Sequence, residues 1–349
     1  MSNKSMINRI AAVAMTASLA ACGSSSAAAA SSSSASTASS AASASSTVYK
    51  VAIVKQLDHA SLDEIANAIT AELDRLADEN GVTIDYGEVY SGQNDATTLQ
   101  QIGSQAIADD VDVIIPIATL AAQTMTVAAQ DTKTPVVFAA ISDPDSADLT
   151  GLDYVTGTSD ALNTEQIMDM IFMANPDASK IGLLYSQSEA NSAKPIEQAK
   201  AYLDAKGIEY VEATANTNDE VITAASTLIS DGVDAVFTPT DNVIMSAELA
   251  IAPMFEEAGI AHYTGADSFV RNGAFATCGV NYTDLGTETA DLAYKALIGG
   301  IESTGYAGTY EVMPGGIITV NSETAAALGL DSSVFASLGT VSEVTTTED

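Results

Sequence analysis

The sequence predicts an α/β fold with two similar lobes, each built around a parallel sheet. The main observation is a repeated pattern of an apolar strand, a helix and a second strand, in which both strands end in polar residues. One copy spans 110–143 and the other spans 232–267. Apolar runs of this length are typical of parallel strands covered on both faces. Their polar ends fall where open α/β sheets bind ligands, beyond the carboxyl ends of the strands.

The second observation is that strands and helices alternate along most of the chain. A strand at 48–54 precedes a helix at about 62–80, where Ile65, Ile69 and Leu73 recur at helical spacing. Further strands are expected at 82–89, 155–159, 180–186, 208–213, 275–282 and 315–320, and further helices at about 95–108, 164–175, 193–206, 219–230 and 285–298. This alternation predicts Rossmann-like lobes, with helices on both faces of each sheet.

The chain after Asp267 is too short for a third domain but long enough to complete both sheets. We therefore expect a hinge in which the chain crosses between the lobes more than once. The first lobe is predicted to comprise 48–159 plus 263–302, and the second 160–262 plus 303–340. A loose acidic tail is expected at 341–349.

The N-terminal region has the features of an export signal. Lys4 and Arg9 precede a short apolar run, and 19–22 reads Leu-Ala-Ala-Cys. We predict a signal peptide at 1–21, followed by Cys22 as the site of lipidation, although a cysteine in an ordinary helix is the alternative. The segment 22–47 is rich in Ser and Ala and has no hydrophobic face, so we expect a tether between a lipid anchor and the folded body.

Composition narrows the classes of partner. The 349 residues suit two domains, and 12 Lys and Arg against 46 Asp and Glu give a formal net charge of −34. Such a charge disfavours nucleic acid as a partner. The two cysteines, Cys22 and Cys278, indicate neither a disulfide framework nor a Cys/His metal site. Neither a cofactor motif nor a nucleophile–base motif is present, so we expect no cofactor and no enzymatic activity.

Candidate ligand-binding residues in the first lobe follow its strands. Gln56 lies in the loop after the first strand, and Thr119 stands between a strand end and a helix start. Free N–H groups at such a helix start can hold an anion, although Thr119 can also serve only as a cap. Ser142 and Asp143 end the next strand, and Pro144 makes an Asx turn the alternative for Asp143.

In the second lobe, Ser188, Asn191 and Ser192 form a polar helix start that could donate hydrogen bonds to a ligand carboxylate. Asp241 with Asn242, and Asp267, end the two strands of the second copy. A carboxylate in this position could pair with a ligand ammonium group. The alternatives are a helix N-cap for Asp241 and a turn for Asp267.

Several segments resemble a known family. They are Ile-Ala-Thr-Leu-Ala-Ala-Gln at 117–123, Ala-Ala-Ile-Ser-Asp-Pro at 139–144, Leu-Tyr-Ser-Gln-Ser-Glu-Ala-Asn-Ser at 184–192, Pro-Thr-Asp-Asn at 239–242 and Gly-Val-Asn-Tyr-Thr-Asp-Leu-Gly at 279–286. Together they resemble the substrate-binding lipoproteins of ABC importers with the type I periplasmic-binding-protein fold, in the branch associated with tryptophan and tyrosine uptake. The resemblance implies two lobes, three crossovers and a ligand clamped between the lobes.

We therefore expect a lipid-anchored, extracytoplasmic monomer that captures an aromatic or large apolar amino acid by hinge closure and passes it to a membrane permease. Three alternatives remain open at this point. The ligand could be a nucleoside or sugar, the protein could report ligand status to a membrane sensor, or the fold could carry an enzyme.

Overall fold

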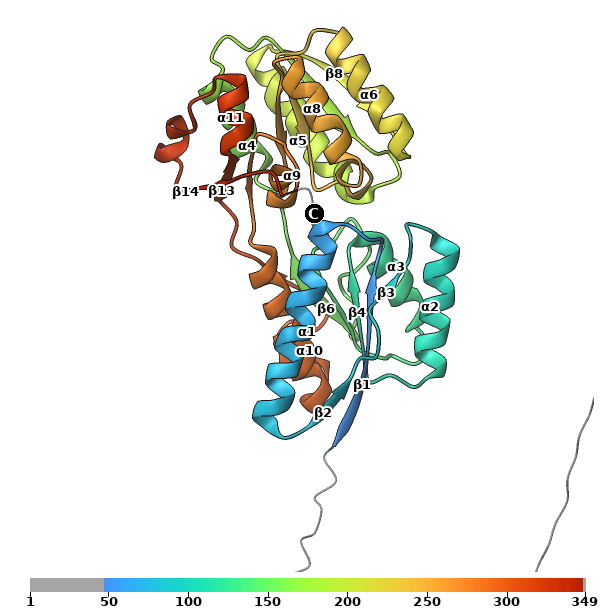
Figure 1. Ribbon diagram of the computed structural model, residues 1–349. Helices are drawn as coiled ribbons and strands as arrows, with labels where there is room; N and C mark the ends of the chain where they lie inside the picture. Colours follow the sequence, from blue (N-terminus) through green and yellow to red (C-terminus); the bar gives the residue numbers. More distant parts are fainter. Residues whose placement is uncertain (1–46, 348–349) are drawn as a thin grey trace, which may run out of the picture. The chain divides into compact units, whose positions relative to one another are not determined.

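The computed structural model describes residues 47–347, which contain two sheets that belong to one compact unit (Figure 1). The predicted export signal at 1–21, Cys22 and nearly all of the predicted tether lie outside the described residues. Within the described part of the chain, none of the helices has the length and apolar character needed to cross a membrane.

The first sheet has the strand order β12-β6-β5-β4-β1-β2, and β3 also pairs with β1. All of its pairings are parallel, as the sequence predicts. The strands are β1 (Val48–Lys55), β2 (Thr83–Asp85), β3 (Tyr90–Ser91), β4 (Val113–Ile117), β5 (Val136–Phe138), β6 (Val155–Ser159) and β12 (Glu311–Val312). The strand expected at 82–89 is shorter in the structure: it is only β2, and β3 follows at 90–91, because Gly87 adopts a positive φ of 57° and donates its N–H to Asp85.

Helices cover both faces of this sheet: α1 (Ala60–Asn80), α2 (Ala96–Ala108), α3 (Thr119–Ala128) and α10 (Tyr282–Gly299), with the 3-10 turn η1 (Ile301–Thr304) after α10. α1 and α10 lie side by side on one face, and α2 and α3 pack on the other (Figure 1). The apolar stripe Ile65, Ile69 and Leu73 of α1 is fully buried. Gly81 ends α1 in a left-handed conformation, and Asp95 caps the start of α2.

The second sheet has the order β14-β13-β11-β10-β9-β7-β8. It is parallel except for the antiparallel pair of β11 and β13. Its strands are β7 (Lys180–Tyr185), β8 (Glu209–Thr214), β9 (Ala235–Thr238), β10 (Ala261–Thr264), β11 (Ala276–Gly279), β13 (Ile317–Asn321) and β14 (Val341–Val344). The buried Cys278 lies in β11 as a packed apolar side chain.

The helices of the second lobe are α4 (Thr164–Ala174), α5 (Ala190–Lys206), α6 (Asn218–Ser230), α7 (Asn242–Met245), α8 (Glu248–Glu257), α9 (Asp267–Arg271), α11 (Ser322–Leu328) and the 3-10 turn η2 (Ser332–Ser337). α4 and α5 pack on one face of the second sheet, while α6 and α8 pack on the other. The two copies of the repeated pattern therefore take equivalent places, with β4, α3 and β5 in one lobe and β9, α7, α8 and β10 in the other.

The chain passes between the lobes three times, after β6, after β11 and after β12. The expected multiple crossing is correct, but the predicted boundaries are wrong at three places. Residues 263–279 belong to the second lobe, because β10 and β11 pair within its sheet. β12 belongs to the first lobe, because it pairs with β6. Val341–Val344 is not a loose tail, since it pairs with β13 as β14.

Candidate functional site

The carboxyl ends of strands from both sheets meet at a cavity of about 20 Å³, which has room for about one water molecule. Residues of both lobes line it: His59, Ser61, Leu62, Ala118, Thr119, Ala140, Ser142, Asp160, Asn191, Thr240, Asp241, Asn242, Met245, Ala266, Phe269 and Tyr282. The wall is therefore part apolar and part polar. Such a mixture suits a small amphipathic ligand.

Five of the ten residues predicted to bind ligand line this cavity, namely Thr119, Ser142, Asn191, Asp241 and Asn242. The other five, Gln56, Asp143, Ser188, Ser192 and Asp267, do not. Their hydrogen bonds show what each side chain does instead.

On the first lobe, the backbone is unusual at the ends of β4 and β5. Ala118 has a φ of 74° and Ala140 a φ of 58°, a region that residues other than glycine rarely occupy. Both residues line the cavity with a single methyl group each. Thr119 begins α3 but does not cap it. The cap bond comes from Gln56, whose Oε1 accepts the N–H of Leu120 at 2.9 Å.

Asp160 is a second buried carboxylate of the site besides Asp241, and it was not among the residues predicted from the sequence. It directly follows β6, and its two oxygens accept hydrogen bonds from the hydroxyls of Ser142 at 2.9 Å and Tyr282 at 3.1 Å. Burial raises its pKa above the ordinary aspartate value, and only hydrogen bonds oppose that shift. The rule that located Ser142, a polar residue at a strand end, applies equally to Asp160 after the strand predicted at 155–159.

On the second lobe, Asn191 presents an acceptor rather than a donor. Its Nδ2 donates to the carbonyl oxygen of Thr240. Its Oδ1 is buried and finds no hydrogen-bond partner within residues 47–347. The expectation that Asn191 donates to a ligand carboxylate therefore does not match its geometry, which favours a ligand that brings donors.

Asp241 is fully buried and its carboxylate is saturated. It accepts hydrogen bonds from the N–H groups of Ser186 at 2.7 Å, Val243 at 3.1 Å and Ile244 at 3.0 Å, and from the hydroxyl of Ser192 at 2.7 Å. A carboxylate offers about four acceptor sites, so these bonds use all of them. The N-cap alternative thus describes Asp241, and Ser192 is its supporting donor. Burial raises the pKa of Asp241 in spite of these bonds.

A row of polar side chains crosses from one lobe to the other beside the cavity. Gln56 donates from Nε2 to Asn94 at 2.9 Å and to Glu189 of the second lobe at 2.8 Å. Asn242 donates to the other oxygen of Glu189 at 2.6 Å, and its Oδ1 lies 3.0 Å from Nε2 of His59. Burial, followed by the charge of Asp241, raises the pKa of Glu189 to about 7.

The three remaining predicted residues make contacts outside the cavity. Ser188 is exposed and bonds to Ser186. Asp143 accepts hydrogen bonds from the N–H and the hydroxyl of Ser146, three residues on rather than the two of an Asx turn, and it also pairs with Lys194 of the other lobe at 3.1 Å. Asp267 pairs with Arg271 at 2.7 Å, while its other oxygen is buried without a partner among the described residues.

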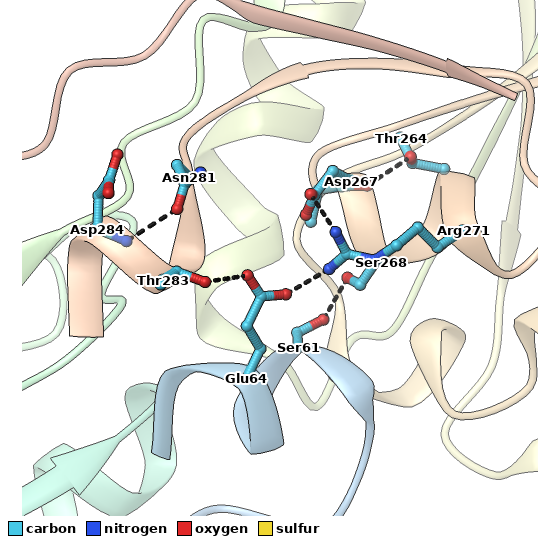
Figure 2. A network of polar contacts seen from close by, with 10 residues as sticks. Ser61, Glu64, Thr264, Asp267, Ser268, Arg271, Asn281, Thr283 and Asp284 are labelled. Carbon is cyan, nitrogen blue, oxygen red and sulfur yellow. Dashed lines mark hydrogen bonds and ion pairs between the residues drawn. The ribbon is translucent and has the colours of Figure 1, made fainter. Parts of the chain in front are cut away.

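Figure 2 shows how Arg271 connects the lobes. Its guanidinium lies between Asp267 on its own helix and Glu64 on α1 of the first lobe. Glu64 also accepts the hydroxyl of Thr283 at 2.8 Å, and Ser61 bonds to Ser268 across the lobes. Within the described residues, the lobes are therefore held together by several direct side-chain contacts.

Comparison with known proteins identifies what this arrangement resembles. The family model for ABC transporter substrate binding proteins matches residues 50–331. A tyrosine-binding protein of Clostridioides difficile (strain R20291) is 31% identical over 256 residues, which cover 71% of this chain and 72% of that protein.

Two solved structures extend the comparison. An ABC domain in complex with L-Trp from Streptococcus pneumonia is 28% identical, with a TM-score of 0.76, and the match covers 84% of this chain and all of that one. The ligand-free, open structure of a substrate binding protein with adhesive properties from Clostridium difficile is 29% identical, with a TM-score of 0.63 over 86% of this chain and all of that one. The chain is thus more similar in shape to the L-Trp complex than to the open structure, in agreement with its direct contacts between lobes.

Proposed function

Because the chain belongs to the family of ABC transporter substrate binding proteins, we propose that it captures an aromatic L-amino acid between its lobes for delivery to a membrane permease. The observation that carries the ligand class is the cavity wall. It combines a buried carboxylate and an unpartnered acceptor with the apolar side chains of Leu62, Met245 and Phe269. The relatives that bind tyrosine and L-Trp support the same class.

Each part of an amino acid has a matching group in the wall. Asp160 and Oδ1 of Asn191 are acceptors for the ammonium group, which brings three donors. The start of α3, with the hydroxyl of Thr119, can receive the carboxylate. Charge-assisted hydrogen bonds contribute about 1.5–3 kcal/mol each, so a few of them with apolar burial reach the roughly 8 kcal/mol of micromolar binding.

Binding requires the lobes to move. The cavity of about 20 Å³ is far smaller than a ligand pocket of roughly 300 Å³ or more. The lobes must separate to admit the ligand and then close on it. Because the ligand touches both lobes only when they are near each other, its differential affinity favours the closed state.

We further propose that the protein works as a monomer outside the cytoplasm, tethered by a lipid on Cys22. The sequence at 19–22 supports this anchor, and the Ser/Ala-rich segment after it would place the folded body away from the membrane. Treating cells with an inhibitor of lipoprotein processing should leave the unprocessed precursor, as judged by mass spectrometry of the N-terminal peptide. A soluble mature form lacking lipid would contradict the anchor.

A thermal-shift screen tests the ligand class. A ligand that binds only the folded state stabilises it by mass action, and therefore raises the unfolding midpoint. At a ligand concentration of about a hundred times Kd, the free energy of unfolding rises by about 2.7 kcal/mol. We expect aromatic L-amino acids to raise the midpoint and nucleosides and sugars to leave it unchanged. A rise with a nucleoside or sugar alone would refute the proposal. Uptake of the same amino acid, lost on deletion of the gene, would favour transport over sensing.

A further inference from the structure

His59 lines the cavity and has one ring nitrogen without a partner. Its Nε2 lies 3.0 Å from Oδ1 of Asn242, while its Nδ1 is buried and bonds to nothing within residues 47–347. Unpartnered buried polar atoms are rare in folded proteins and call for an explanation. A group that forms a hydrogen bond with Nδ1 of His59 would supply the missing partner.

The neighbouring side chains fix the hydrogen on the ring. The N–H of Leu120 orients the Gln56 amide, so that amide directs its Nε2 at one oxygen of Glu189. The other oxygen of Glu189 accepts Nδ2 of Asn242, which turns Oδ1 of Asn242 toward His59. An amide oxygen only accepts, so Nε2 of His59 carries the hydrogen and Nδ1 is left as an acceptor. Burial lowers the pKa of His59 to about 4, which keeps the ring neutral at pH 7.

The strand order places this acceptor at the opposite end of the site from Asp160. His59 follows β1 and Asp160 follows β6, and the order β6-β5-β4-β1 puts three strand spacings, about 14 Å, between those strand ends. Ala118 and Ala140 follow the ends of the two strands between them. A ligand whose ammonium group meets Asp160 would therefore extend its side chain along the small residues toward His59.

We propose that Nδ1 of His59 accepts a hydrogen bond from a donor on the ring of the bound amino acid, the phenol O–H of tyrosine or the indole N–H of tryptophan. His59 would then be the specificity-determining residue that disfavours phenylalanine, which leaves the acceptor unpaired. The inference rests on the proposed function. A site built to pair with a donor rejects the analogue that lacks it, so we expect the full chain to bind L-tyrosine at least about tenfold more tightly than L-phenylalanine.

Two substitutions at the same position separate the two ring nitrogens. His59→Asn places an amide oxygen near the position of Nδ1 but does not reach Asn242. His59→Gln reaches Asn242 but offers no acceptor at the position of Nδ1. By titration calorimetry with L-tyrosine, L-phenylalanine, L-tryptophan and 1-methyl-L-tryptophan, His59→Asn should keep a preference for the ligands with donors. His59→Gln should lose that preference.

The affinities of the unaltered chain for L-tyrosine and L-phenylalanine already test the role of His59, without any variant. Equal affinity of the unaltered chain for L-tyrosine and L-phenylalanine would overturn the role of His59 while leaving the proposed function intact. A preference that survives in His59→Gln would also overturn it. If none of the four amino acids binds, the proposed function itself fails, and the inference fails with it. Unfolding midpoints of both variants without ligand confirm that they fold.

Discussion

The ion pair between Arg271 and Glu64 should help to hold the lobes closed without ligand. Glu64→Gln removes the charge from the first-lobe side of this contact but keeps the size of the side chain and an acceptor for Thr283. Glu64 is the better choice for substitution, because Arg271 still has Asp267 as a partner. The side chains of Arg271 and Glu64 are 29% and 23% exposed, so solvent screens the pair. A contribution of about 1 kcal/mol follows, which is roughly a fivefold change in the ratio of closed to open molecules.

Small-angle X-ray scattering of the ligand-free protein measures this change. The radius of gyration of Glu64→Gln should rise relative to the wild type, and saturating ligand should restore it. Glu79→Gln is the matched control, since Glu79 also lies on α1 and pairs with Arg75, but both residues belong to the first lobe. The reasoning is refuted if Glu64→Gln scatters like the wild type, or if Glu79→Gln opens the protein to the same degree.

Three further substitutions follow from the site. Asp160→Asn should weaken amino acid binding by about 10- to 100-fold in calorimetry, because one charge-assisted bond is lost. It should not lower the unfolding midpoint. Burial disfavours the charged form of Asp160, as its raised pKa shows, and a neutral amide does not carry this desolvation cost. A lower midpoint with unchanged affinity would contradict this role. The raised pKa of Glu189, about 7, means that the folded state binds more protons than the unfolded state between about pH 4.5 and pH 7, so stability falls as pH rises through this range, by about 3 kcal/mol in total. Glu189→Gln should remove that part of the slope from denaturant titrations at several pH values, and an unchanged slope would exclude Glu189 as its source. Ala118→Gly should raise the free energy of unfolding by about 1 kcal/mol, and with it the unfolding midpoint, because glycine tolerates a φ of 74°. A lower midpoint would show that the backbone at Ala118 is not strained.

The sequence predicted the type of most elements, because that information is local. Helical spacing located α1, and the ranges expected for α1 and α2 end close to where these helices end in the structure. The pairing of strands is not local. Whether the segment 263–279 joins the first or the second sheet depends on contacts with residues far away in the chain, and its own periodicity carries no sign of its partner. All three errors in the predicted lobe boundaries concern such strand pairings.

The site shows a similar division. Polar residues at strand ends are visible in a sequence, and this rule placed Thr119, Ser142 and Asp241 at the cavity. The rule does not tell which oxygen remains free. Asp241 reads as a better ligand for an ammonium group than Asn191 does, yet four donors from its own lobe occupy its carboxylate. Of these two side chains, Asn191 is the one with a buried oxygen that has no hydrogen-bond partner among the described residues.

The contacts between lobes differ in whether a ligand must break them. Ser142 donates its one hydroxyl hydrogen to Asp160, so the hydroxyl of Thr240 donates to Ser142 across the lobes at 3.0 Å. Both residues line the cavity, and an incoming amino acid has to separate them. Arg271 and Glu64 do not line it, so their pair can persist around a bound ligand. A neutral hydrogen bond is worth about 0.5–1.5 kcal/mol, whereas each charge-assisted contact of the ligand contributes about 1.5–3 kcal/mol. Closure around the ligand therefore exchanges a weak contact for stronger ones while the outer pair stays in place.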